Sequence, residues 1–154
     1  MFKRDPKNTL ASDAVAPDVQ QAANFHEMVI PKGFEPQAFL AGAKIAFTNL
    51  QKAWDEHDLA EIRSLSTDKV FAEIQDQLKA SDAENRTDIL KLEAELLDVR
   101  EIGSELEAVV LFEAVMREDA SGQAEQVREV WHFVKPQISI QPKWYLDGIQ
   151  QLQE

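Results

Sequence analysis

Few side chains in the sequence have types and spacing that could perform chemistry. The three histidines, His26, His57 and His132, form no ligand pattern, and the chain has no cysteine. No glutamate–histidine pair occurs at helical spacing, and no nucleophile elbow, phosphate-binding loop or dinucleotide fingerprint is present. The sequence therefore predicts neither a metal site nor a cofactor.

The best case for catalysis is a pocket with aromatic walls. Its candidate lining residues are Trp54, Trp131, Phe133 and Trp144. Within such a pocket Asp98, Asp147 or His132 could act as acid or base. Strand alternation places Trp131 and Phe133 on one face and His132 on the other, so His132 is excluded if the tryptophan faces the pocket. We expect a filled structural core rather than an active site, with a passive pocket for a small ligand or lipid as the alternative.

A long helix must carry the first of these residues. Apolar side chains recur at helical spacing from Pro36 to about Asp55, and proline suits the first turn of a helix. This apolar stripe consists of Phe39, Ala43, Ala46, Phe47, Leu50 and Trp54. Asp58 begins a capping box for a short helix that ends near Leu65, and Ser66 or Thr67 can cap a third helix.

From Thr87 the hydrophobic period changes to that of strands. Turns are expected at Gly103-Ser104 and at residues 119–122, and the Leu96-Leu97 pair predicts a bulge. The third strand should run from about 124 to 134 and the fourth from about 143 to 151, with a proline-bounded loop at 136–142 between them. Helices followed by hairpin-linked strands predict an α+β fold, with the helices packed on a curved four-stranded antiparallel sheet.

Both faces of the middle strands are apolar. The second face is expected to hold either a homodimer contact or the N-terminal arm. We assign residues 1–32 to that arm or linker and 33–154 to the folded domain. A short apolar patch lies in the arm and is a candidate contact for a membrane or a partner. It consists of Phe25, Met28, Val29 and Ile30. The rival interpretation is that the patch docks onto the protein's own sheet.

The charge of the chain is unevenly distributed. Residues 1–33 carry four basic and four acidic side chains, so the whole formal net charge of −12 falls on the remainder. Such an acidic domain is repelled by nucleic acid and is unsuited to broad adsorption on anionic lipid, whereas a basic protein partner is permitted. The sequence also holds no run of about 18 apolar residues that could span a bilayer.

Several short motifs, in order along the chain, resemble one known family. They are Gly33-Phe34-Glu35-Pro36, the stretch from Phe39 to Phe47, Ala53-Trp54-Asp55, Asp58-Leu59, Leu65-Ser66-Thr67, Glu129-Val130-Trp131-His132-Phe133 and the stretch from Pro142 to Gln150. The family is the C-terminal domain of subunit forty-four of the mitochondrial inner-membrane translocase and its bacterial relatives. The likeness covers about residues 33–151, and most of the matching positions are core or turn residues.

The resemblance implies a cone-like fold of the nuclear-transport-factor-two type and a non-enzymatic adaptor that binds protein partners and contacts a membrane. The mitochondrial members tether a chaperone of the import motor to the channel. The sequence has no counterpart of their chaperone-recruiting region, so we do not expect that activity. The implied location is a bacterial inner membrane, on its cytoplasmic side, with either the arm or a native anchor upstream of Met1 as the membrane tie.

Overall fold

The computed structural model describes residues 29–80, 86–119, 122–137 and 143–152. Three helices come first: α2 spans Pro36–Asp55, α3 spans Leu59–Leu65 and α4 spans Asp68–Lys79. Four strands follow, which are β1 (Thr87–Ile102), β2 (Glu105–Glu118), β3 (Ala124–Pro136) and β4 (Tyr145–Gln151). The element order confirms the predicted α+β fold class.

Local signals set the helix boundaries as the sequence predicts. Pro36 occupies the first turn of α2, where its missing N–H group costs no hydrogen bond. The Asp58 carboxylate accepts from the backbone N–H of Glu61 at 3.1 Å and so caps α3. Thr67 stands at the N-cap of α4, but its hydroxyl oxygen accepts no bond from the helix N–H groups. The hydroxyl donates to the Asp147 carboxylate at 3.0 Å instead.

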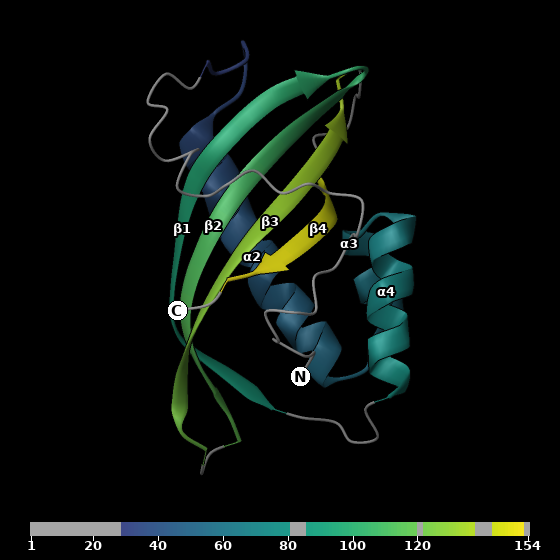
Figure 1. Cartoon of the computed structure of the whole chain (residues 1–154), viewed down its shortest axis with the longest axis vertical. Helices are drawn as coiled ribbons and strands as arrows, with labels where there is room; N and C mark the ends of the chain where they lie inside the picture. The colour runs from purple at the N-terminus through teal and green to yellow at the C-terminus, as the bar shows by residue number, and fades with distance from the viewer. Residues whose placement is uncertain (1–28, 81–85, 120–121, 138–142, 153–154) are drawn as a thin grey trace.

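The strands form one antiparallel sheet in the order β1-β2-β3-β4. The sheet is strongly curved, and α2 runs along one side of it (Figure 1). The β1–β2 register shifts between Leu96 and Asp98, which confirms the predicted bulge at Leu96-Leu97. A second shift, between Ile89 and Lys91, was not predicted.

The predicted ends of two strands were wrong by two residues. Strand β3 continues through Pro136, which pairs with Glu105, because a proline at a strand end need not donate to the ladder. Strand β4 begins at Tyr145 rather than Lys143. Residues 138–142 of the predicted loop lie outside the described residues.

The main core lies between the helices and one face of the sheet. Its centre is formed by Phe47 from α2, Phe112 from β2 and Trp131 from β3, with ring centroids 4.8–5.1 Å apart. Ile62 of α3 and Ile74 of α4 close it from the side. We call this sheet face the inner face and the opposite one the outer face.

A bilayer-spanning segment requires length and continuous apolar character together. No helix within the described residues combines the two.

Candidate functional site

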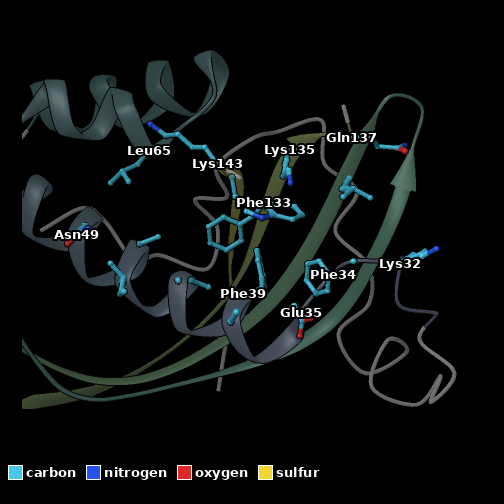
Figure 2. Close-up of a pocket in the computed structure, with 18 residues that line it drawn as sticks. Lys32, Phe34, Glu35, Phe39, Asn49, Leu65, Phe133, Lys135, Gln137 and Lys143 are labelled. Carbon is cyan, nitrogen blue, oxygen red and sulfur yellow. The ribbon is translucent and has the colours of Figure 1, made fainter. Parts of the chain in front are cut away.

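A groove of about 880 Å³ opens between the N-terminal half of α2 and the nearby ends of β2 and β3. The turn before α2 and the segment leading into β4 complete its walls (Figure 2). Its volume lies within the range of about 300–1,000 Å³ that is usual for small-ligand sites.

Four aromatic rings form the apolar floor of the groove. Phe39 is central, with its ring centroid 5.2 Å from Phe34, 5.6 Å from Phe133 and 4.9 Å from Trp144. Three of the four contacts among these rings are edge-to-face, as aromatic pairs prefer, and the Phe34–Phe39 contact is tilted. Phe34, Phe39 and Trp144 remain partly exposed, so the floor is accessible from the groove.

The wall supplied by α2 is made of small or exposed apolar residues. Ala38, Gly42, Ile45 and Ala46 line it, and the Ile45 side chain is 61% exposed. A Cβ atom built on Gly42 would meet no heavy atom within 4 Å. The helix therefore leaves space at Gly42 that a larger side chain would fill.

Three lysines stand around this apolar surface. Lys32 precedes the turn, Lys135 lies near the end of β3, and Lys143 leads into β4. The Lys135 Nζ atom lies 5.9 Å from the Trp144 ring centroid, and the Lys143 Nζ atom lies 5.2 Å from that of Tyr145, both within cation–π range. Glu35 is the one carboxylate among the described lining residues, so the rim is locally basic in an acidic chain.

The aromatic residues predicted to line a pocket divide between two places. Trp144 lines the groove and is partly exposed, whereas Trp54 and Trp131 are only 2% and 1% exposed and belong to the core alone. Phe133 belongs to both places, because it lines the groove and is also a core residue that is 3% exposed. The Trp131 Nε1–H group donates to the Glu129 carboxylate at 2.9 Å, which satisfies the indole inside the core.

The candidate acid–base residues lie away from the groove. Asp147 accepts from the Thr67 hydroxyl at 3.0 Å and lies 3.6 Å from the ammonium group of Lys69, so it ties β4 to the start of α4. Asp98 pairs with Val109 in the sheet, and its carboxylate lies 3.9 Å from Arg100. Both carboxylates are therefore occupied in structural contacts.

His132 lies on the outer face, opposite to Trp131, as strand alternation predicts. Its Nδ1 atom is 3.4 Å from Oε2 of Glu107. This histidine and the neighbouring Arg100 hold the pKa of Glu107 below its ordinary value, although burial of the carboxylate acts in the opposite direction.

The described lining of the groove contains no histidine and no pair of carboxylates. Throughout the described ranges, moreover, no three or more histidine, aspartate or glutamate side chains gather where they could hold a metal ion. What the groove offers is apolar contact and positive charge, which suit binding.

Sequence reasoning missed Phe34, Gly42 and the lysine rim. A signal was nevertheless present, because each lysine stands within two residues of a groove aromatic: Lys32 near Phe34, Lys135 near Phe133 and Lys143 beside Trp144. This spacing places the lysines around an apolar floor when the end of β3, the segment before β4 and the start of α2 come together in the fold.

Half of the predicted membrane or partner patch can be placed. Val29 is 82% exposed and Ile30 is 39% exposed, just ahead of the turn that borders the groove. Phe25 and Met28 lie outside the described residues. The predicted domain boundary between residues 32 and 33 stays a prediction.

Comparison with known proteins identifies one family. A family model described as the Tim44-like domain matches residues 21–151, which is most of the chain, and confirms the resemblance seen in the sequence motifs. No curated protein matches the chain significantly.

Proposed function

Because the chain belongs to the Tim44-like domain family, we propose that it is a non-enzymatic, membrane-associated adaptor that binds a segment of a partner protein in the lysine-rimmed groove. The observation that carries the proposal is an open apolar floor with three lysines around it, in a chain whose net charge is −12. Positive charge around one apolar opening suits a partner segment that carries both apolar and acidic side chains.

The partner segment is an amphipathic one. Its apolar side chains lie on Phe39 and Trp144, where burial contributes about 25 cal/mol per Å². Carboxylates on its flanks face Lys135 and Lys143, and these pairs set orientation and association rate more than affinity. The rest of the domain surface is acidic and repels the carboxylates of such a segment. The segment is therefore directed to the groove, where the lysines are.

A site-specific crosslinker tests this site. We expect a photoreactive side chain placed at Ile45, in the groove wall, to form adducts with the partner. Gly42→Phe should abolish these adducts by filling the open space, whereas Gly42→Ala adds one methyl group and should retain them. The same crosslinker at Leu90, which is 49% exposed on β1 outside the groove, is the positional control. Equal adducts at Leu90, or adducts at Ile45 that survive Gly42→Phe, would refute the proposal.

The membrane tie is proposed to include Val29 and Ile30. Burying two such side chains in an interface contributes about 1.5–3 kcal/mol each when complete. We expect the double substitution Val29→Asp and Ile30→Asp to weaken co-sedimentation with vesicles that contain phosphatidylglycerol by tenfold or more. The matched control, Leu90→Asp with Ile102→Asp, changes two other exposed apolar residues and should bind like the parent chain. Equal losses in both variants would reject a specific role for residues 29 and 30.

A second candidate function uses the same groove, and its volume is the observation that favours it. A space of about 880 Å³ with an apolar floor and a basic rim also suits a single-chain anionic amphiphile. Native mass spectrometry of the purified chain, followed by titration with oleate, separates the candidates. Stoichiometric oleate binding that Gly42→Phe abolishes, without partner adducts at Ile45, would favour the lipid-binding function.

A further inference from the structure

The groove between α2 and the strand ends is elongated along the helix. Figure 2 shows Asn49 and Leu65 toward one end of the groove and Lys32 toward the other, with the ring of Phe39 between them. From Ala38 to Asn49 the lining residues of α2 span about 16 Å, at about 1.5 Å per residue. The groove therefore has the length for a stretch of chain that lies alongside about three turns of α2.

The two long walls of the groove present side chains rather than a free strand edge. The α2 wall is helical, so beyond its first turn the N–H and C=O groups are used inside the helix. On the other side β2 and β3 are interior strands of the sheet, and their inner-face residues Leu106, Phe133 and Lys135 form the wall. An occupant of this apolar surface must therefore satisfy its own backbone hydrogen bonds, because burying unpaired N–H and C=O groups is costly. An α-helix does so within a single segment, whereas an extended strand does not.

Charge is unequally divided between the two walls. Lys135 and Lys143, on the strand side, have Nζ atoms 5.9 and 5.2 Å from the ring centroids of Trp144 and Tyr145. Within the described parts of the chain, neither lysine forms an ion pair with a carboxylate. The α2 wall carries small or apolar side chains along most of its length, with Glu35 as its one charged residue. This division matches a helix that bears carboxylates along one flank only.

Building on the proposed adaptor function, we propose that the partner segment binds as an amphipathic α-helix that packs lengthwise on α2. Its larger apolar side chains lie on Phe39 and Trp144, and the carboxylates of one flank face Lys135 and Lys143. Packed helix axes lie about 8–10 Å apart, and the exposed Gly42 permits an approach at the lower end of that range. Gly42 is therefore the position that determines whether a helix can reach the aromatic floor.

Two synthetic peptides of about 15 residues test the conformation of the occupant. The first carries leucines along one face and glutamates along one flank, and a lactam bridge holds it helical. The second differs only in a central proline at a solvent-facing position, which breaks the helix. Fluorescence anisotropy with the full-length chain should show binding of the first peptide and binding of the second that is weaker by tenfold or more. Equal affinities, or no binding of the helical peptide, would overturn the proposal.

Variants of the chain locate the helical peptide in the groove. Gly42→Phe should abolish binding, whereas Gly42→Ala should retain it. Lys135→Glu with Lys143→Glu should weaken binding tenfold or more, and a peptide with lysines in place of its glutamates should bind this variant again. The matched control, Lys44→Glu with Lys52→Glu, changes two exposed lysines of α2 that do not line the groove and should bind like the parent chain. Equal losses in the two lysine pairs would overturn the placement of the acidic flank.

Crosslinking of the natural partner separates a failure of this inference from a failure of the adaptor function. Photoreactive side chains placed at Ala38 and Asn49 should capture partner residues about 11 positions apart if the partner is helical, and about five apart if it is extended. The shorter spacing would overturn the helix and leave the adaptor function standing, whereas the absence of adducts at Ile45 would refute the adaptor function itself. Self-association that Gly42→Phe abolishes, or oleate binding without peptide binding, would replace the partner helix by a second copy or by a lipid.

Discussion

Two aromatic clusters lie along the same helix and the same strand, yet one is a core and the other a groove. Near the middle of α2, Phe47 packs on Phe112 and Trp131, and all three rings are about 1% exposed. Two turns earlier, Phe39 packs on Phe133 and Trp144 with similar ring geometry, but its surroundings stay open to solvent. Aromatic packing alone therefore does not distinguish a structural from a binding surface.

The difference lies in what covers each cluster. The C-terminal half of α2 is flanked by α3 and α4, which contribute Ile62, Val70 and Ile74 to the core. It is also anchored to β1, because the Asp55 carboxylate accepts from both the backbone N–H and the hydroxyl of Thr87, at 2.7 and 3.1 Å. The N-terminal half has no such second layer among the described residues, and lysines stand around it instead.

The largest contrast is expected from truncating a ring in each cluster. Phe47→Ala should lower the free energy of unfolding by about 3–5 kcal/mol, because it removes a buried ring and leaves a cavity. Phe34→Ala, in the open cluster, should lower it by about 1 kcal/mol because that ring is only partly buried. Urea denaturation of both variants measures the difference. Similar losses in both would mean that the groove is part of the core.

The anchor between α2 and β1 should have the next largest effect. Asp55→Ala leaves the two Thr87 donors without this acceptor and should cost about 2–3 kcal/mol of unfolding free energy. Asp55→Asn preserves the shape and one acceptor oxygen, so we expect a loss of about 1 kcal/mol. Urea midpoints of the two variants provide the check. If Asp55→Ala lowered the unfolding free energy by less than Phe34→Ala does, the contact between Asp55 and Thr87 would not stabilise the C-terminal half of α2.

The helices, the strand order and the Leu96-Leu97 bulge were predictable from sequence, because hydrophobic period and turn residues are local signals. The groove was not, because Lys32, Phe39 and Lys135 meet only after α2 has packed on the sheet. For the same reason the sequence does not distinguish Trp131 from Trp144, although Trp131 is buried and donates to Glu129 whereas Trp144 is partly exposed in the groove.

A smaller, pH-dependent effect is expected on the outer face of the sheet, where Glu107 is partly buried beside His132 and Arg100. His132 and Arg100 lower the pKa of Glu107 in the folded protein, so the ionised carboxylate stabilises the fold. That stability is present above the ordinary glutamate pKa of 4.5 and is lost as pH falls through the lowered folded value. Glu107→Gln should therefore cost about 1 kcal/mol near pH 6. Denaturation at a series of pH values should show the cost shrinking below pH 4.5, and a cost independent of pH would contradict the assignment.

The smallest effect, and the sharpest test of the contrast, comes from two adjacent residues of α2. Both residues line the groove, but Gly42 is exposed there, whereas Ala43 is 3% exposed and packs in the main core. Gly42→Ala should raise the free energy of unfolding by about 1 kcal/mol, because alanine favours the helix and its methyl group meets nothing. Ala43→Val adds volume one position later and should instead lower it, because inserting methyl groups at a buried core position strains the packing around it. Thermal unfolding of the two variants measures both signs. A loss of stability in Gly42→Ala would mean that the added methyl group meets other atoms and that the groove is closed in solution. The N-terminal half of α2 would then be covered like its C-terminal half, and the contrast between the two halves would fail.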